Sequence, residues 1–314
     1  MPTDPDRHSP DRPRLLITGM DGFVGGWLTR TAEPEWRCLP LAGADGKSVD
    51  LRDGTAVRAA VSAAGADAVI HLAAQSHVPS SFADPSTTFS VNVVGTVNLL
   101  AALQAVGFAG PVLMVSTGDA YGPVAEQDLP IREDRPLAPA NPYAASKACA
   151  EVACAHWARH GGGMRVVVAR AFNHIGPGQD QRFAVSAFAR QIAAMRRSGG
   201  ELVVGDIDTT RDFTDVRDVV MAYLALLEHG RNGSVYNVCS GQETSLREIL
   251  RRMLRIAGIE AEPRVDPAKL RPVDQRRVRG DPQALMSATG WRPTIPLDRS
   301  LADILDYWQQ KDHP

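Results

Sequence analysis

The sequence has few cysteines and no long apolar run. Four cysteines occur: Cys38, Cys149, Cys154 and Cys239. They show no Cys-x-x-Cys spacing, which favours reduced structural thiols of a cytoplasmic protein over disulfides. The eight histidines form no metal-binding pattern, so no metal site is expected. No apolar run reaches the ~18 residues of a membrane-spanning helix. The polar, proline-rich start is no signal peptide and predicts a disordered tail over residues 1–13.

The chain also lacks an excess of either charge. Its 34 Lys and Arg oppose 36 Asp and Glu, for a formal net charge of −2 at pH 7. A nucleic acid or a membrane surface is therefore not expected as a partner. What remains is an ordinary globular composition, 44% hydrophobic and 22% charged over 314 residues. This length suits one large domain or two unequal ones.

A glycine-rich turn follows the first apolar run. Residues 14–18 predict a strand, and Gly19, Gly22 and Gly25 then open a predicted helix. Glycines let the backbone turn sharply and approach a pyrophosphate, which the exposed N–H groups of the helix start favour. The spacing is GxxGxxG rather than GxGxxG, and a plain glycine-rich loop is the alternative.

Strands and helices then alternate, which is typical of an α/β Rossmann-type, doubly wound parallel sheet. Further strands are predicted at 36–41, 67–74, 112–115 and 164–170, and helices at 87–104 and 143–160. The rhythm changes after Pro177, although residues 234–239 predict a strand that returns to the sheet. We therefore expect a cofactor-binding domain over 14–170 and a smaller, mainly substrate-binding domain over 171–314, with a ligand cleft between them.

The clearest candidates for catalytic residues lie between Ser116 and Lys147. Tyr143 and Lys147 are four residues apart and share a helix face. We expect the ammonium to lower the pKa of the tyrosine from its ordinary value of ~10, so that it exchanges protons more readily. Ser116 and Thr117 follow a predicted strand, and open α/β sheets bind ligands at that end. An ordinary surface pair is the alternative for Tyr143 and Lys147.

Two further positions bear on a nucleotide cofactor. The second predicted strand runs into Leu41 rather than into the carboxylate that usually holds the ribose hydroxyls of NAD, and Asp45 and Lys47 come later. This pattern slightly favours NADP(H), with NAD(H) still possible. Asn92, a poor helix former, lies inside a predicted helix, and both a bonded core asparagine and a functional role remain open.

An ordered set of motifs carries a family resemblance. They are TGMDGFVG, DAVIHLAAQ, NVVGTVNLL, STGDAYG, PYAASK, ARAFNHIGPGQ, RDFTDVRD and GWRP. Over about residues 14 to 308 the chain resembles the extended short-chain dehydrogenase/reductases of nucleotide-sugar metabolism. The stretches FNHIGPGQ, QIAAMRR, VVGDIDTTRDFTDV and YNVCSGQE are most similar to GDP-4-keto-6-deoxy-D-mannose reductases, which form GDP-D-rhamnose, and next to GDP-mannose 4,6-dehydratases.

The resemblance implies a role for each matching residue. Tyr143 is the expected proton donor, Lys147 its partner at the nicotinamide ribose, and Thr117, with Ser116, the hydrogen-bond donor to the reacting oxygen. The expected cofactor contacts also include Gly19, Asp21, Gly22, Phe23, Val24, Gly25, Asp50, Leu51, Leu72, Ala73, Ala74 and Asn92. The expected substrate contacts are Gln75, Ser76, Asn173, Arg211, Arg271 and Asp274. For Arg271 a solvated run of arginines is the alternative.

The family contains both reductases and dehydratases. Dehydratases place a glutamate two residues after the threonine, and here that position is Asp119, one methylene shorter, which counts against elimination. Residues 75–78 look more like the dehydratases. The cysteine that GDP-fucose-forming epimerases use has no counterpart near Thr117. We expect reduction of the C4 ketone of a GDP-4-keto-6-deoxy sugar in deoxysugar and polysaccharide biosynthesis. A GDP-mannose 4,6-dehydratase, or a related NDP-sugar dehydratase or epimerase, is the alternative.

Two partners follow from this expectation. The substrate requires an upstream 4,6-dehydratase as a pathway partner. The predicted helices 87–104 and 143–160 carry more apolar surface than one sheet face needs, which favours a homodimer through a four-helix bundle.

Overall fold

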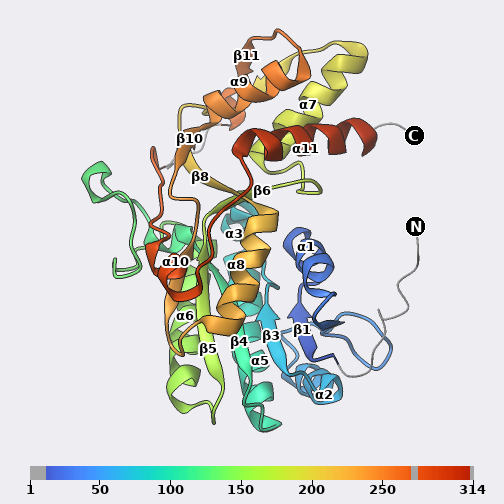
Figure 1. Cartoon of the computed structure of the whole chain (residues 1–314), viewed down its shortest axis with the longest axis vertical. Coiled ribbons are helices and arrows are strands. Elements are labelled where there is room, and N and C mark those ends of the chain that lie inside the picture. The colour runs from blue at the N-terminus through green and yellow to red at the C-terminus, as the bar shows by residue number, and fades with distance from the viewer. Residues whose placement is uncertain (1–11, 270–274, 312–314) are drawn as a thin grey trace.

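A six-stranded parallel sheet forms the centre of the larger part of the molecule (Figure 1). The computed structural model describes residues 12–269 and 275–311, so Arg271 and Asp274 lie outside the described residues. The strands, in spatial order, are β2 (Arg37–Pro40), β1 (Arg14–Thr18), β3 (Ala68–His71), β4 (Pro111–Thr117), β5 (Arg165–Ala171) and β9 (Val235–Val238). The order reverses between β1 and β3, and the carboxyl ends at such a point are where open α/β sheets bind ligands.

Helices cover both faces of this sheet because its strands are apolar on both sides. In β1, Leu15 and Ile17 belong to one core cluster and Leu16 to the other, as the two-residue period of a strand requires. One face is covered by α1 (Phe23–Ala32) and α8 (Val216–His229). The other carries α2 (Gly54–Ala64), α5 (Gly95–Ala105) and α6 (Pro142–His160). The prediction of a doubly wound Rossmann-type sheet is confirmed.

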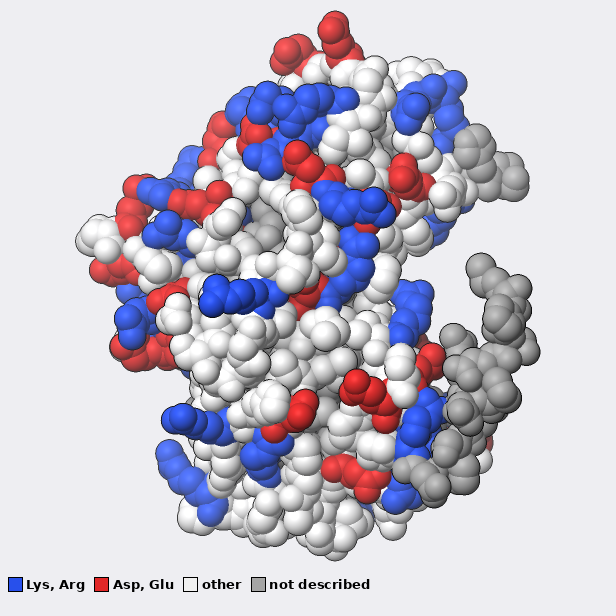
Figure 2. All heavy atoms as spheres, in the orientation of Figure 1, with Lys and Arg blue, Asp and Glu red and all other residues white. Residues whose placement is uncertain are grey.

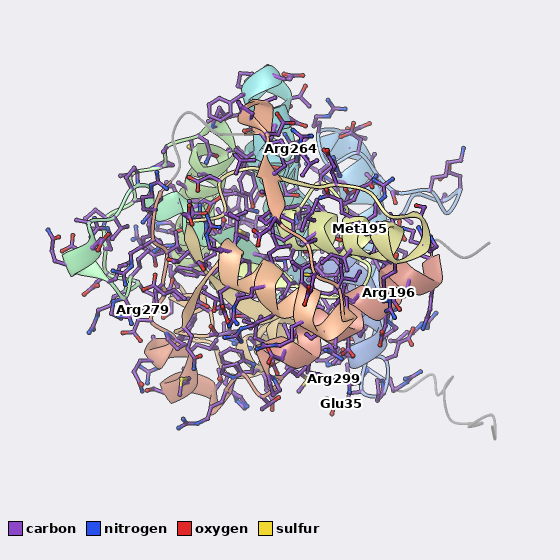
Figure 3. The ribbon with its side chains drawn as sticks, turned by 90° about the horizontal axis from the view of Figure 1, so that it is seen from above. Glu35, Met195, Arg196, Arg264, Arg279 and Arg299 are labelled. Atoms are coloured by element: carbon purple, nitrogen blue, oxygen red, sulfur yellow. The ribbon has the colours of Figure 1, made fainter. Side chains whose placement is uncertain are left out.

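A smaller region lies beyond the carboxyl ends of the strands, at the top of Figure 1. Its strands are β6 (Asn173–Ile175), β7 (Leu202–Val204), β8 (Thr210–Asp215), β10 (Glu243–Ser245) and β11 (Pro263–Val265), in two small sheets. Its helices α7 (Ala184–Ser198), α9 (Leu246–Ala257) and α11 (Leu297–Lys311) share a separate core. Figure 3 looks down on this region, with Met195 and Arg196 on α7 and Arg299 on α11. Ser245 caps α9, since its hydroxyl accepts a hydrogen bond from the Glu248 N–H.

Segments from the second half of the chain also pack on the main sheet. Besides the predicted strand β9, helix α8 contributes Val220 and Tyr223 to the core beside β1. Helix α10 (Gln283–Thr289) adds Leu285 to the same core. The chain therefore passes several times between the two regions after residue 171.

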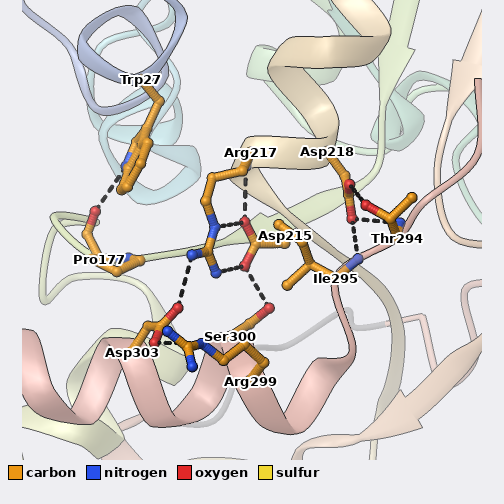
Figure 4. A network of polar contacts seen from close by, with 10 residues as sticks. All are labelled: Trp27, Pro177, Asp215, Arg217, Asp218, Thr294, Ile295, Arg299, Ser300 and Asp303. Carbon is orange, nitrogen blue, oxygen red and sulfur yellow. Dashed lines mark hydrogen bonds and ion pairs between the residues drawn. The ribbon is translucent and has the colours of Figure 1, made fainter. Parts of the chain in front are cut away.

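A polar network joins the two regions where α8 begins (Figure 4). Asp215 accepts hydrogen bonds from the Arg217 guanidinium and from the Ser300 hydroxyl of α11. Arg217 also pairs with Asp303 of α11 at 2.8 Å. Beside it, the Trp27 indole of α1 donates to the Pro177 carbonyl. These contacts anchor α11 and the loop around Pro177 to the main sheet domain.

One helical segment, Pro85–Ala105, is long and apolar enough to cross a membrane by length and composition alone. It consists of α4 (Pro85–Phe89), a π-helical turn (Ser90–Val94) and α5. Leu99, Leu100 and Leu103 are buried in the core of the main sheet domain, so the segment is a core helix.

On the face drawn in Figure 2, basic and acidic side chains are interspersed, as the small net charge suggests.

The remaining elements are short. They are α3 (Val78–Ala83) and the 3-10 helices Gly118–Tyr121, Glu126–Asp128 and Pro267–Lys269.

Candidate active site

The glycine turn is built by close backbone contacts. Gly19 has a φ of +74°, and a Cβ there would lie 2.9 Å from the Ala73 nitrogen. A Cβ on Gly25 would lie 2.3 Å from the Gly19 carbonyl oxygen, so helix α1 can pack against the turn only without that side chain. The N-cap residue Gly22 makes no side-chain cap, and the first turn of α1 holds no acidic residue. The first N–H groups of α1 therefore have no side-chain cap, an arrangement that suits the binding of a pyrophosphate.

Asp21, Phe23 and Val24 share this turn. Asp21 is exposed, whereas Phe23 is half-buried and stacks on His174, with 6.2 Å between ring centroids. Burial lowers the pKa of His174, so the ring is neutral at pH 7.

The expected adenine pocket lies beside α5. Leu51 is buried against Gly95, where a Cβ would come within 2.8 Å of the Leu51 side chain. Asp50 is exposed and pairs with Arg52 at 2.6 Å, and hydrogen bonds from Arg52 lower the pKa of the Asp50 carboxyl to about 2. The carboxylate is therefore ionised at neutral pH.

The loop after β3 (Leu72, Ala73, Ala74, Gln75, Ser76) is fixed by Asn92. The Asn92 side chain accepts from the Gln75 N–H at 2.8 Å and donates to the Gln75 carbonyl at 3.0 Å and to the Ser146 hydroxyl at 2.9 Å. Asn92 is thus a fully bonded core asparagine. The Gln75 side chain is also used inside the protein, since it accepts from the His77 N–H and donates to Thr88. Ser76 is exposed.

Tyr143 and Thr117 meet at the ends of α6 and β4. Asn141 caps α6 by accepting the Ala144 N–H at 2.8 Å, which places Tyr143 in the first turn. Burial raises the pKa of Tyr143 well above its ordinary value, the Asp119 carboxylate raises it further, and the hydrogen bond with Thr117 opposes both. The expectation of a lowered Tyr143 pKa was wrong, because burial is the dominant effect and raises it.

Lys147 lies one turn further along α6 and is 2% exposed. Burial lowers the pKa of its ammonium to about 8, from an ordinary 10.5. Cys154 and Glu151 oppose that change. The ammonium is therefore mostly charged at pH 7, and it loses its proton as the pH rises through about 8.

Ser116 differs from Thr117 in its surroundings. Its hydroxyl donates a hydrogen bond to the Glu151 carboxylate at 2.5 Å, so this proton is not available to a substrate. The expected hydrogen bond to the reacting oxygen therefore depends on Thr117, whose side chain accepts the Asp119 N–H at 3.2 Å.

Two of the expected substrate contacts, Asn173 and Arg211, lie in the smaller region. Asn173 is exposed at the start of β6, directly after β5. Arg211 of β8 donates to the Thr210 carbonyl and, at 2.9 Å, to the Gln275 carbonyl. Gln275 is the first described residue after 270–274, and the expected contacts Arg271 and Asp274 lie outside the described residues.

Comparison with known proteins gives the family. The family model described as GDP-mannose 4,6 dehydratase matches residues 45–304. GDP-6-deoxy-D-mannose reductase of Pseudomonas aeruginosa is 47% identical over 303 residues, covering 95% of this chain and 98% of the relative. The chain belongs to the extended short-chain dehydrogenase/reductase family.

Solved structures agree with this membership. The structure of RMD from Pseudomonas aeruginosa complexed with NADPH matches with a TM-score of 0.88 and 46% identity, covering 95% of this chain and 99% of that one. UDP-glucose 4-epimerase of Thermus thermophilus, complexed with NAD, matches with a TM-score of 0.82 and 32% identity, over 94% and 99% of the two chains.

Two buried ionisable residues of this site were missed by the sequence analysis. Glu151 follows Lys147 by four residues, and this helical spacing was a usable signal. His71 ends the buried strand β3, where burial and histidine identity together could have drawn attention.

Proposed function

We propose that this protein reduces the C4 ketone of a GDP-4-keto-6-deoxy sugar with NADPH, converting GDP-4-keto-6-deoxy-D-mannose to GDP-D-rhamnose. The observation that carries the proposal is the 47% identity with a GDP-6-deoxy-D-mannose reductase over nearly the whole of both chains. Identity of this extent spans the cofactor turn, the Tyr143 helix and the smaller region alike.

The residues present fit a dinucleotide cofactor. The turn from Gly19 to Gly25 packs closely on its own backbone because glycines stand at its tightest contacts, and such turns carry the pyrophosphate of a dinucleotide. Strand β2 ends at Pro40 without a carboxylate, and Asp45 is used in its own turn by accepting the Lys47 N–H. This arrangement and the NADPH in the Pseudomonas aeruginosa relative favour NADPH, with NADH as the alternative.

The chain's own residues then supply the proton chemistry. The bound cofactor provides the hydride that goes to C4. Tyr143 donates a proton to the ketone oxygen, and its raised pKa keeps the hydroxyl protonated at neutral pH. Thr117 orients the same oxygen through its hydroxyl. Lys147 provides a positive charge one helical turn away, at the ribose side.

The sugar nucleotide is held from the smaller region. Asn173 and Arg211 are the described candidates, and Arg271 with Asp274 are candidates outside the described residues. Guanidinium groups suit this role because they pair with phosphate oxygens through two parallel N–H donors.

A GDP-mannose 4,6-dehydratase is the second candidate. The observation that favours it is the match of residues 45–304 to the family model described as GDP-mannose 4,6 dehydratase. Asp119 occupies the position of the dehydratase glutamate, and its carboxylate raises the pKa of Tyr143. Elimination needs a base that reaches the C5 proton, and aspartate is one methylene shorter than the glutamate of the dehydratases. We therefore place reduction first.

The partners follow from this assignment. A 4,6-dehydratase in the same cytoplasm supplies the 4-keto sugar for deoxysugar and polysaccharide synthesis. The protein acts as a homodimer through the helical segment Pro85–Ala105 and α6, on which Val94 and Val152 are 46% and 72% exposed. Light scattering tests the dimer, and a monomer at micromolar concentration would exclude it.

The function is tested by following NADPH and NADH at 340 nm with GDP-mannose, with and without a known 4,6-dehydratase. We expect oxidation of NADPH only when the dehydratase is present, and NMR of the product then gives the C4 configuration. A 4-keto product from GDP-mannose with this protein alone would establish the dehydratase instead. No turnover with any 4-keto sugar nucleotide would exclude the reductase.

A further inference from the structure

One carboxylate of the smaller region is completely buried. Asp212 lies in β8, directly after Arg211, and is 0% exposed. Its Oδ1 accepts hydrogen bonds from the Ser240 N–H at 2.8 Å and from the Ser240 hydroxyl at 2.6 Å. Its Oδ2 accepts from the Gly241 N–H at 2.9 Å and from the Gly280 N–H at 3.2 Å. The carboxylate therefore joins three separate segments: β8, the turn after β9 (residues 239–242) and the segment 275–280.

The contacts at this junction fit a carboxylate and no other side chain of the same size. Four donors match the two oxygens of an ionised carboxylate, which accept about four hydrogen bonds and donate none. The amide of an asparagine would instead place N–H groups against N–H groups. Gly280 comes this close because it has no side chain, since a Cβ there would lie 2.6 Å from the Cys239 sulfur. The junction thus depends on the carboxylate of Asp212.

The same junction determines the surroundings of Arg211. Side chains alternate along a strand, so Arg211 and Asp212 point to opposite faces of β8. On its own face, the Arg211 guanidinium donates to the Gln275 carbonyl at 2.9 Å. Gln275 and Gly280 belong to the segment 275–280, which runs beside β8. Arg211 is therefore held by its own strand and by a segment that Asp212 fixes.

The groups around Asp212 leave it mostly ionised at pH 7. Burial raises the pKa of Asp212 to about 6, and the hydrogen bonds from Ser240, Gly280 and Gly241 oppose this effect. Glu243, its cross-strand neighbour in β10, is ionised, because hydrogen bonds from Arg277 lower its pKa. Burial raises the pKa of Cys239, so that thiol is neutral. The other charged side chains of the surrounding segments are those of Glu133, Arg279 and Asp281.

We propose that Asp212 is a positioning residue for the sugar nucleotide: its carboxylate holds the turn after β9 and the segment 275–280 against β8, and so fixes Arg211 for binding of the diphosphate. Because it is fully buried, it does not touch the substrate. The proposal rests on the proposed function and deepens it, since Arg211 is one of the proposed substrate contacts. The cofactor turn lies in the main sheet domain and should not depend on Asp212.

The first test observes the junction by NMR without any ligand. In protein made by cell-free synthesis with 13C′-serine and 15N-glycine, a 13C′-filtered spectrum shows only glycines that follow a serine, which are Gly199 and Gly241. Labelling with 13C′-arginine and 15N-glycine selects Gly280 alone. We expect the Gly241 and Gly280 signals to titrate with a midpoint near pH 6. Gly199, whose N–H donates to the Met195 carbonyl, is the internal control and should not titrate.

Two variants separate the carboxylate from its surroundings. D212N removes the titrating group, so both signals should shift from their wild-type positions and lose their titration. S240A keeps the carboxylate but removes a hydroxyl that lowers its pKa, so the midpoint should move to higher pH. Thermal melting shows whether each variant is folded. Wild-type positions of the Gly241 and Gly280 signals in folded D212N would overturn the proposal, and if D212N does not fold, the absence of a titration in the wild type would overturn it.

The second test measures binding by calorimetry. GDP-mannose is the probe, because its diphosphate keeps a constant charge over the pH range used. At pH 7.5, D212N should bind GDP-mannose at least about tenfold more weakly and NADPH within about threefold of the wild type. In the wild type, the affinity for GDP-mannose should fall about fourfold between pH 7.5 and pH 5.5, as the ionised fraction of Asp212 falls, and D212N should lack this dependence. D208N removes an exposed carboxylate that pairs with Arg247 and is the matched control, with normal binding of both ligands.

The outcomes separate this inference from the proposed function. Equal losses of GDP-mannose and NADPH affinity in folded D212N would show a merely structural role and overturn the proposal. Normal GDP-mannose binding by folded D212N would overturn it as well. If the wild type binds no GDP-mannose at pH 7.5, the proposed substrate fails, while the glycine signals still decide whether Asp212 joins the three segments.

Discussion

The imidazole of His71 is connected to the backbone of Tyr143 by a chain of buried hydrogen bonds. His71 Nε2 lies 2.9 Å from the Thr96 hydroxyl, which donates to the Asn92 carbonyl at 2.7 Å. The Asn92 side chain donates to the Ser146 hydroxyl, and Ser146 donates to the Tyr143 carbonyl at 2.7 Å. This series of hydrogen bonds connects the end of β3 to the first turn of α6. The loop after β3 and Tyr143 therefore keep a fixed relative position.

The direction of these bonds determines the tautomer of His71. Because the Thr96 proton is used toward Asn92, Thr96 must accept from His71 Nε2–H. His71 Nδ1 is then the acceptor of the Thr18 hydroxyl at 2.6 Å, and Thr18 in turn accepts the Ala73 N–H at 3.2 Å. A second proton on the ring, at Nδ1, would require the Thr18 hydroxyl to turn its own proton away from His71. Burial is the main cause of the lowered pKa of His71, and the loss of this hydrogen bond acts in the same direction.

Acid should therefore destabilise the protein through His71. Burial lowers the pKa of this histidine to about 3, from 6.5. Between these values the unfolded chain binds a proton that the folded chain does not, so stability is full above pH 6.5 and falls as the pH is lowered toward 3. We expect His71 to account for a loss of about 2 to 3 kcal/mol between pH 7 and pH 4.5. Urea unfolding at the two pH values measures it.

The variant H71N isolates this contribution. It should be less stable than the wild type at pH 7, by about 1 to 3 kcal/mol, because buried hydrogen bonds are lost. Its stability should change less between pH 7 and pH 4.5. H229N replaces a half-exposed histidine and serves as the control, with the wild-type pH dependence. An unchanged pH dependence in H71N would show that His71 is not the group responsible.

Removal of the Tyr143 hydroxyl should abolish proton donation without disturbing this chain. Ser146 donates to the backbone carbonyl of residue 143, a contact that Y143F retains. We expect kcat to fall by about 10²- to 10⁴-fold, the usual contribution of a positioned general acid. The dissociation constant for NADPH, measured by fluorescence, should stay within about threefold of the wild type. A Y143F enzyme with near-normal kcat would remove Tyr143 from its proposed role.

Asp119 distinguishes the two candidate reactions. In a reductase its carboxylate acts only through the pKa of Tyr143, so D119N should keep reductase activity within about tenfold of the wild type. In a dehydratase the same residue would be the base, and D119N would lose about 10²-fold or more. Parallel assays with GDP-4-keto-6-deoxymannose plus NADPH and with GDP-mannose alone separate the two outcomes. D119E, which restores the missing methylene, is the matched variant for the elimination.

The sequence was sufficient for features that depend on local pattern. The apolar strands, the strand–glycine–helix start and the four-residue spacing of Tyr143 and Lys147 each lie within one stretch of chain. The buried ion pair between Glu151 and Arg170 could not be derived in this way, because it depends on the register that sets Ser116 beside Arg170. The direction of the Tyr143 pKa depends on burial, which the sequence does not give. The return of α8 to the main sheet is likewise a matter of tertiary packing.

The two adjacent glycines of α1 give a matched test of the cofactor turn. A Cβ on Gly25 would lie 2.3 Å from the Gly19 carbonyl oxygen and 2.5 Å from that of Met20, so G25A must displace the turn. A Cβ on Gly26 would meet only the end of Arg30, at 4.0 Å. We expect G25A to weaken NADPH binding at least about tenfold and to lower stability. The Cβ would collide with backbone carbonyl groups, which cannot move aside as a flexible side chain can. G26A should bind normally and gain up to about 1 kcal/mol, because alanine is the better helix former. Fluorescence titration and urea unfolding measure both, and equal behaviour of the two variants would contradict a pyrophosphate site built on the contact between Gly19 and Gly25.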